Sequence, residues 1–92
     1  MISRAVVIGN TLGLHARAAA RFVQLAGTFG AQVRVDRAGR TIDGKSIMGL
    51  LLLAAAQGCL ITISASGADE EQALAALCAL VARGFDEVTP CA

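Results

Sequence analysis

The segment LITISAS, from Leu60 to Ser66, decides the fold class of this chain. From its second residue onward it alternates between apolar and hydroxyl-bearing side chains. Ile61, Ile63 and Ala65 therefore fall on one side of an extended strand and the hydroxyl groups on the other. A strand of this kind belongs to a sheet with one wet face, which is typical of antiparallel sheets. We therefore expect an antiparallel sheet that helices cover on one face only.

Three further strands are expected in the first half of the chain. Ser3 to Ile8 is rich in β-branched residues and stops at the turn pair Gly9-Asn10. Two short alternating segments, Gln32 to Asp36 and Arg40 to Asp43, flank Gly39, which favours a tight turn. Together these two segments predict a hairpin.

An amphipathic helix is expected from Ala16 to Ala26, because apolar residues recur there at steps of three and four. Arg17 and Arg21 lie together on another face of this helix. Gly27 and Gly30 are expected to end it, since glycine tolerates the left-handed backbone found at many helix ends. The apolar positions of the helix are Ala16, Ala19, Phe22, Val23 and Ala26.

Two more helices are expected in the second half of the chain. Ser46 is a good N-cap residue for a short helix from Ile47 to Leu53. Asp69 followed by Gln72 resembles a capping box that opens a last helix. The buried stripe of that last helix is expected to contain Leu74, Leu77, Cys78 and Val81.

The expected element order is therefore β-α-β-β-α-β-α. With strands that have one polar side, this order predicts an α+β open-faced sandwich, in which a four-stranded antiparallel sheet carries three helices on one face. The ferredoxin-like split βαβ arrangement shares the first six elements and is the alternative fold. A chain of 92 residues fits one domain, which we expect to span residues 1–88 with a short tail at 89–92.

The composition and the apolar runs of the sequence indicate a folded protein outside the membrane. With 55% hydrophobic and 16% charged residues, the chain has enough apolar surface to form a core. Its longest apolar run, Ile47 to Ala56, is about half of the roughly 20 residues that cross a bilayer, so we expect no membrane insertion. The N-terminus lacks the pattern of a secretory signal, and we expect a cytoplasmic protein.

Charge and cysteine content argue against several kinds of ligand. A net charge of +1 and the absence of Trp and Tyr give no basis for nucleic-acid binding. Cys59, Cys78 and Cys91 are too widely spaced for a metal or redox pair, so reduced thiols are expected. No pattern in the sequence predicts a metal ion or a cofactor.

The single histidine, His15, lies between the Gly13-Leu14 loop and the first expected helix. Unpaired N–H groups and the helix dipole favour anions at that end. The amides of Ala16 and Arg17 and the Arg17 guanidinium are therefore candidates to hold phosphoryl oxygens. Neutral imidazole is a nucleophile near neutral pH and its protonated form leaves readily, so His15 is suited to carry a phosphoryl group. The residues alone leave open that His15 is simply a polar residue at a helix start.

Two separated motifs carry a resemblance to a known family. Gly13-Leu14-His15-Ala16-Arg17 resembles the active-site signature of the HPr family, the histidine-containing phosphocarrier proteins of the bacterial phosphoenolpyruvate-dependent sugar phosphotransferase system. Gly44-Lys45-Ser46-Ile47-Met48-Gly49 is similar to the regulatory serine segment of that family, and the likeness continues from Ile61 to Glu70. The resemblance covers nearly the whole chain with unchanged spacing.

The resemblance implies a phosphoryl carrier that is not itself an enzyme. His15 would accept a phosphoryl group at Nδ1 from enzyme I and donate it to IIA proteins, with Arg17 stabilising the phosphate. Ser46 would be a regulatory site for a serine kinase/phosphorylase. A phosphate on Ser46 would add negative charge beside the surface that meets partners, which predicts weaker docking. We expect the carrier to be a monomer.

A docking surface is expected on the short second helix, because the apolar residues between Ile47 and Leu52 cannot all face the core. If the family's fold applies, the exposed ones lie near the His15 loop, with Arg17, Arg21 and Lys45 at the rim. Such a surface suits partners with an acidic-rimmed hydrophobic groove. A broad core stripe is the alternative interpretation. The candidate docking residues are Arg21, Ile47, Met48, Leu51 and Leu52.

Two positions depart from the pattern of the family. Ala18 stands where the family usually has Pro, and Leu12 stands where a small polar residue is usual. Proline fits the first turn of a helix without losing a hydrogen bond. Ala18 therefore predicts a slightly less fixed helix start and no loss of function.

The segment from Gly39 to Ser46 also matches the nucleotide-binding pattern G-x-x-x-x-G-K-[ST]. A P-loop joins a buried parallel strand to a substantial helix, whereas Arg40 to Asp43 is expected at the edge of a hairpin. We interpret this match as chance.

Two other functions remain open at the level of sequence. One is a regulatory interaction module of the same fold that acts through protein contacts. The other is a carrier of the nitrogen-linked branch of the phosphotransferase system, which uses similar proteins with different partners.

Overall fold

The computed structural model describes residues 1–86, so the predicted tail at 89–92, Cys91 and the last residues of the expected domain lie outside the described residues. The elements follow the order predicted from the sequence, with one short 3-10 turn after the last helix. They are β1 (Ile2–Val7), α1 (Ala16–Ala26), β2 (Gln32–Arg37), β3 (Arg40–Asp43), α2 (Ile47–Leu52), β4 (Leu60–Ser66), α3 (Glu70–Ala82) and η1 (Gly84–Asp86).

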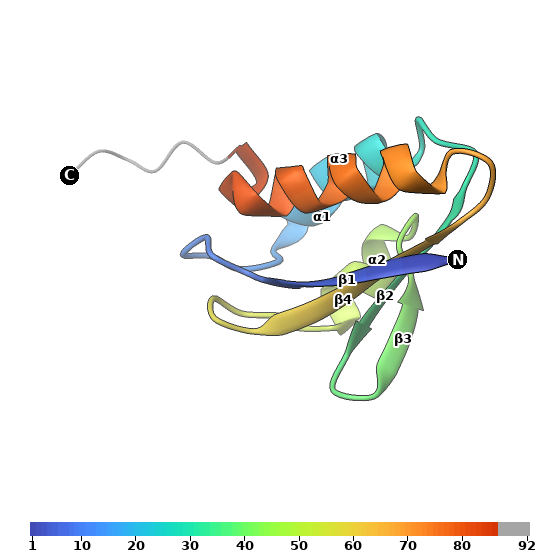
Figure 1. Cartoon of the computed structure of the whole chain (residues 1–92). Helices are drawn as coiled ribbons and strands as arrows, with labels where there is room; N and C mark the ends of the chain where they lie inside the picture. Colours follow the sequence, from blue (N-terminus) through green and yellow to red (C-terminus); the bar gives the residue numbers. More distant parts are fainter. Residues whose placement is uncertain (87–92) are drawn as a thin grey trace.

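The four strands form one antiparallel sheet in the order β1-β4-β2-β3. β4 lies inside the sheet, where Ile63 is opposite Arg4 of β1 on one side and Val35 of β2 on the other. β1 is an edge strand (Figure 1). This order excludes the ferredoxin-like alternative, in which the first strand lies inside the sheet.

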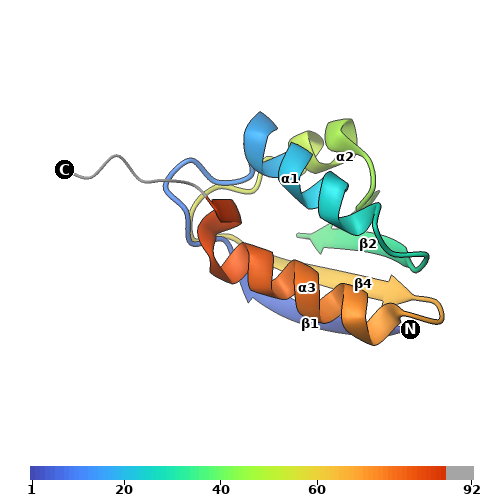
Figure 2. The same cartoon turned by 90° about the horizontal axis from the view of Figure 1, so that it is seen from above.

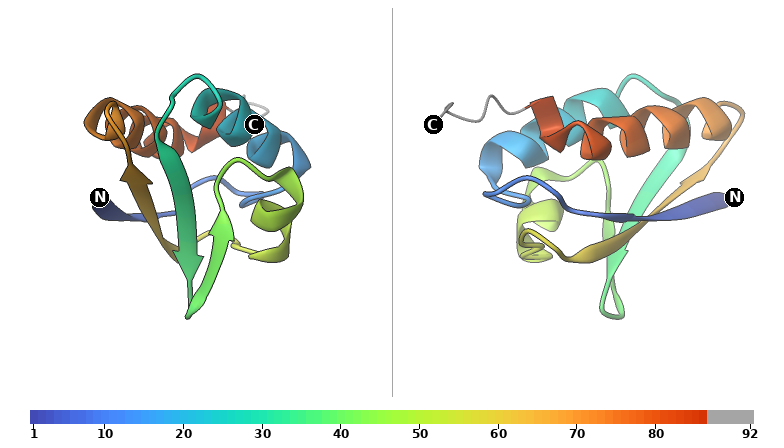
Figure 3. Two further views of the ribbon diagram at one scale, coloured as in Figure 1. Left: turned by 90° about the vertical axis from the view of Figure 1, so that its right-hand side faces the viewer. Right: turned by 60° about the vertical axis from the view of Figure 1, so that its left-hand side comes forward.

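The helices cover one face of the sheet, as the open-faced sandwich requires. Seen from above, α3 runs along β1 and β4 while α1 lies on the β2 side (Figure 2). The short helix α2 packs between α1 and the end of β3 (Figure 3). No helix within residues 1–86 is long and apolar enough to cross a bilayer.

The apolar side of β4 faces the core, as the sequence predicted. Ile61, Ile63 and Ala65 are all 1% exposed or less. Ser64 points to the other face, yet it is only 9% exposed. It lies between Ser3 of β1 and Arg34 of β2 in the register of the sheet, so neighbouring strands shield a side chain that we expected to be wet.

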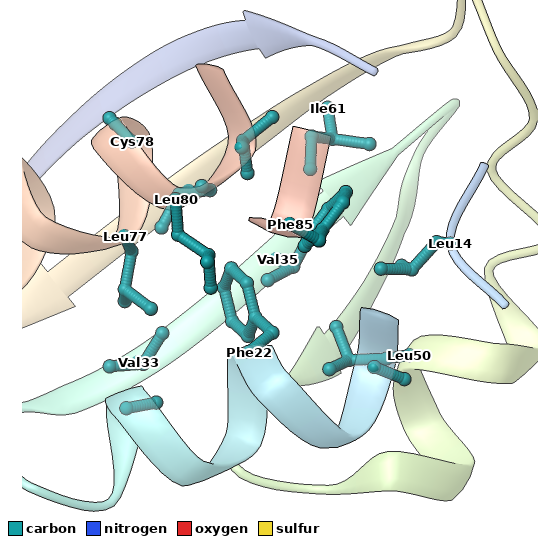
Figure 4. Close-up of a cluster of buried hydrophobic side chains, with 14 of the residues drawn as sticks. Leu14, Phe22, Val33, Val35, Leu50, Ile61, Leu77, Cys78, Leu80 and Phe85 are labelled. Carbon is teal, nitrogen blue, oxygen red and sulfur yellow. The ribbon is translucent and has the colours of Figure 1, made fainter. Parts of the chain in front are cut away.

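The core combines side chains from the sheet and from all three helices (Figure 4). Phe22 of α1 and Phe85 of η1 are its largest fully buried side chains. The predicted stripe of α3 is confirmed, since Leu74, Leu77, Cys78 and Val81 are all buried. The core of α1 differs slightly from the prediction, because Ala18 is buried while Ala16 is exposed.

Two predicted helix ends form differently. Gly27 follows α1 as expected, but its φ of −66° is right-handed, so the helix ends without a left-handed glycine. Asp69 precedes α3 without capping it. Its carboxylate instead accepts hydrogen bonds from the backbone N–H groups of Gly30 (2.9 Å) and Ala31 (2.8 Å). These contacts tie the start of α3 to the loop before β2.

The ends of α2 are both fixed by side chains. The Ser46 hydroxyl accepts a hydrogen bond from the N–H of Gly49 at 3.0 Å, which confirms the predicted N-cap. The helix ends at Leu52, one residue before the predicted boundary. Arg40 donates to the carbonyl of Leu52 and Arg37 to that of Leu53, so two cations of the β2-β3 hairpin lie at the negative end of the helix dipole.

Candidate functional site

His15 is the N-cap residue of α1. Its backbone is extended (φ −83°, ψ 179°), and its carbonyl accepts the first helical hydrogen bond, from the N–H of Ala19. The Nδ1 atom of the ring accepts a hydrogen bond from the N–H of Arg17 at 3.3 Å. A neutral ring that accepts at Nδ1 carries its proton on Nε2. The structure therefore places an imidazole lone pair at the positive end of a helix dipole.

The loop before His15 is anchored from two sides. The Leu14 side chain is only 5% exposed, and its N–H donates to the carbonyl of Ala55 at 2.8 Å. Gly13 has a φ of +67°, and a Cβ at that position would lie 2.6 Å from the Ala55 carbonyl oxygen. The side chain of Asn10 donates to the carbonyl of Gly13 at 2.8 Å. The position of His15 thus depends on a loop that only glycine can complete at residue 13.

The charges around this site favour an anion. The first turn of α1 contains no acidic residue, and Arg17 is exposed. The predicted phosphate ligands included the amides of Ala16 and Arg17. In this structure the Arg17 amide bonds the ring itself, a detail that residue spacing could not reveal.

Two cations near the predicted docking surface form bonds within the protein. Arg21 is half-buried, and its Nη1 donates to the carbonyl of Phe85 at 2.5 Å. Lys45 Nζ donates to the carbonyl of Phe29 at 2.8 Å. Sequence reasoning missed both contacts, because the partners are backbone atoms of distant segments. Among the three expected rim cations, Arg17 is exposed, whereas Arg21 and Lys45 are half-buried.

The short helix α2 presents an apolar surface. Met48 is 68%, Leu52 61% and Ile47 42% exposed, whereas Leu50 is buried. Leu51 is half-buried against the core. Leu12, in the loop before His15, is also 68% exposed. The expectation that some apolar residues of α2 face outward agrees with these exposures.

The protein is a small open-faced α+β sandwich. Its single histidine caps a helix, and an exposed arginine follows two residues later. These features are typical of a protein that carries an anionic group on an imidazole ring. The family comparison makes this specific. Residues 2–83 match the family model described as "PTS HPr component phosphorylation site". The chain belongs to the HPr family of phosphocarrier proteins of the phosphotransferase system.

Individual relatives agree with this membership. The chain is 51% identical over 87 residues to the phosphocarrier protein HPr of Cupriavidus necator, covering 95% of this chain and 98% of the relative. It is 41% identical over 88 residues to the phosphocarrier protein NPr of Shewanella violacea, covering 96% of this chain and 97% of the relative. The HPr relationship is the better supported of the two.

A solved structure confirms the fold. The crystal structure of HPr-C-His from Thermoanaerobacter tengcongensis matches with a TM-score of 0.92 and 42% sequence identity. The match covers 97% of this chain and all of the other chain. The predicted resemblance and the predicted open-faced sandwich are therefore both correct.

Proposed function

We propose that His15 accepts a phosphoryl group from phosphorylated enzyme I and donates it to IIA proteins. The observation that carries this proposal is the hydrogen bond from the Arg17 N–H to His15 Nδ1. It supports Nδ1 as the nucleophile, because this nitrogen holds a lone pair where negative charge is stabilised.

Phosphoryl transfer to His15 forms one bond to phosphorus and breaks another. The Nδ1 lone pair attacks phosphorus, the new P–N bond forms, and the bond from phosphorus to the donor breaks. The Arg17 N–H loses its acceptor and can donate to a phosphoryl oxygen, while the exposed guanidinium adds a charge-assisted bond. Because Nε2 is still protonated, the phosphorylated ring is cationic and the imidazole is a good leaving group, which allows transfer to the next protein.

The chain holds the phosphoryl group and its partners supply the catalysis, so we propose a carrier that is not an enzyme.

The direct test incubates the protein with enzyme I and phosphoenolpyruvate and looks for acid-labile, alkali-stable phosphate. We expect it on the wild type and on Arg34→Met, which removes an arginine from the exposed sheet face. His15→Ala should carry none. Equal labelling of His15→Ala would refute the proposal.

The docking surface that we propose for these partners consists of Ile47, Met48 and Leu52, with Leu51 at its edge. The exposures of the first three support it. Arg17, two residues after His15, is exposed and suits an acidic rim on the partner. Arg21 was expected on this surface, but its bond to Phe85 favours a different role.

We further propose Ser46 as a site for a serine kinase/phosphorylase. Its side chain caps α2, directly beside Ile47 and Met48. A phosphate there would place nearly two negative charges next to a surface that meets acidic partners. Ser46→Asp should slow phosphorylation of His15 by enzyme I, while Ser46→Ala should not. An unchanged rate for Ser46→Asp would rule out this form of regulation.

We also propose that the protein acts in the sugar-linked branch, that it is cytoplasmic and that it is a monomer. The higher identity to a relative named HPr than to one named NPr favours the sugar branch. A similar solved structure is described as an HPr dimer from Thermoanaerobacter tengcongensis, so sedimentation of this chain over a range of concentrations is the test of the monomer. Measuring phosphoryl transfer to the IIA proteins of each branch distinguishes a carrier of the sugar branch from one of the nitrogen branch. If the protein transferred its phosphoryl group to neither set, a regulatory interaction module would be favoured.

A further inference from the structure

The last described turn, η1, packs against α1 and lies next to Asn10 in the loop before it. Phe85 is fully buried in the same core cluster as Leu14, the residue that precedes His15. Figure 4 shows the Phe85 ring in the part of the core that contains Ile61, Val35 and Leu14. A segment near the end of the chain therefore packs where the His15 loop enters the core.

The backbone of this turn is held in an unfavourable conformation. Gly84, Phe85 and Asp86 have φ values of 67°, 59° and 58°, and only the first of them is a glycine. Non-glycine residues adopt this region at a cost in free energy, and such a turn persists only where other contacts fix it. The contacts that fix η1 should therefore control its position.

Arg21 supplies one of these contacts. Its Nη1 donates to the Phe85 carbonyl at 2.5 Å, across 64 positions of the sequence. A second contact is the ion pair between Arg83 and Asp86, with Nε and Oδ1 2.8 Å apart. The pKa of Asp86 is lowered, first by its hydrogen bond from Arg83 and also by the charges of Arg83 and Arg21. The Arg21 side chain thus points into the turn and its charge is partly balanced there.

The other side of the turn contacts the His15 loop. A Cβ on Gly84 would lie 3.5 Å from Cβ of Asn10, so the two segments are within van der Waals reach. Asn10 is buried, its side chain donates to the Gly13 carbonyl at 2.8 Å, and its own carbonyl accepts from the Gly13 N–H at 3.1 Å. A continuous set of contacts leads from Arg21 through η1 to the loop that places His15.

We propose that Arg21 is a positioning residue for phosphoryl transfer, which acts by holding η1 beneath the loop of residues 9–14. This inference rests on the proposed function of His15 as phosphoryl acceptor. It assigns Arg21 no contact with the phosphoryl group or with a partner protein. Arg17 and Arg21 are four residues apart on α1, but Arg17 is exposed, whereas Arg21 is half-buried and bonds the Phe85 carbonyl.

The test compares steady-state phosphorylation by enzyme I for three variants and the wild type. Arg21→Met removes the hydrogen bond and keeps an apolar stem, Arg21→Lys keeps a charge and a donor, and Phe85→Leu disturbs η1 while leaving Arg21 in place. We expect Arg21→Met and Phe85→Leu to lower kcat roughly tenfold with little change in KM, because misplacing a reacting group slows the step that follows binding. Arg21→Lys should recover most of the rate. Arg34→Met is the matched loss of a surface arginine and should behave like wild type.

A second measurement separates positioning from general destabilisation. Amide chemical shifts of residues 10–15 should move in the same direction in Arg21→Met and Phe85→Leu, and combining the two changes should add little to either alone. Should Arg21→Met fail to fold, Arg21→Lys and Phe85→Leu carry the same comparison. If Arg21 instead contacted the partner, Arg21→Met would raise KM and Phe85→Leu would have no effect, and this result would overturn the inference. An unchanged kcat in either variant would overturn it as well. No phosphorylation of the wild type would count against the proposed function and not against Arg21 alone.

Discussion

Nδ1 of His15 accepts a hydrogen bond from the backbone N–H of Arg17 at 3.3 Å. The same residue that supplies an exposed guanidinium thus also orients the imidazole through its main chain. Because the bond lies within the first turn of α1, the ring lone pair and the positive end of the helix dipole coincide. This arrangement supports the proposed attack by Nδ1 on phosphorus.

The first prediction concerns the tautomer of this ring. A bond accepted at Nδ1 leaves the proton of the neutral imidazole on Nε2. Nitrogen-15 chemical shifts of the His15 ring, measured in alkaline solution, should therefore show the Nε2–H form in excess. The spectrum of the Nδ1–H form would contradict the hydrogen bond from the Arg17 N–H to Nδ1.

The second prediction concerns the glycine of the His15 loop. Gly13→Ala should destabilise the protein by about 3 kcal/mol, because a left-handed backbone and a close contact with Ala55 act together. Gly39→Ala is the matched control, since Gly39 also has a positive φ (+83°) but nothing lies within 4 Å of its added Cβ. It should cost about 1–2 kcal/mol. Unfolding in denaturant measures both changes, and equal losses would show that the Ala55 contact is unimportant.

The third prediction separates docking from stability. Met48→Ala should raise KM for phosphorylation by enzyme I roughly tenfold, the effect of truncating an important contact residue. Met48 is 68% exposed, so the free energy of unfolding should change by no more than about 0.5 kcal/mol. Leu60, which is 58% exposed on β4, provides the control. Leu60→Ala should leave KM unchanged, and a similar rise in both variants would argue against a surface centred on α2.

The fourth prediction concerns acid stability. The pKa of Asp69 is lowered, first by the hydrogen bond from the Gly30 N–H and then by that from Ala31, with a smaller effect of Lys45. A carboxyl group whose pKa is lower in the folded state stabilises the protein above its unfolded pKa of about 4, and this contribution is lost as the pH falls through the folded value. Asp69→Asn should therefore lower the melting temperature by a few degrees at neutral pH.

The difference between wild type and Asp69→Asn should shrink below about pH 4, where the wild-type carboxylate becomes protonated. Glu71→Gln removes a neighbouring exposed carboxylate from the first turn of α3 and is the control. Its melting temperature should stay close to wild type at every pH. A constant difference for Asp69→Asn down to strongly acidic pH would mean that its charge is not the cause.

Much of the fold could be predicted from local pattern. The alternation in β4 predicted the sheet with one apolar face, and the three- and four-residue steps of α1 predicted an amphipathic helix that begins at Ala16. Ser46 was recognised as a cap because its hydrogen bond to Gly49 spans three residues. The candidate site was also local, since His15 and Arg17 are two residues apart at a helix start.

The long-range contacts could not be predicted in the same way. Asp69 satisfies the pattern of a helix cap, but its carboxylate binds Gly30 and Ala31, 39 and 38 residues away. Ser64 is polar and was expected on the solvent-exposed face of the sheet, but it is buried because β4 lies inside the sheet. Neither outcome follows from the residues within a few positions of the side chain.

The sequence by itself determined the secondary structure, the order of the elements and the histidine at the start of α1, because each of these depends on side-chain periodicity or on hydrogen bonds within one turn. Only the tertiary structure decided that β1 is an edge strand, that Arg21 turns inward to Phe85 and which of the apolar residues of α2 remain exposed. Those features depend on which distant segments pack together, and many pairings are compatible with the same local pattern.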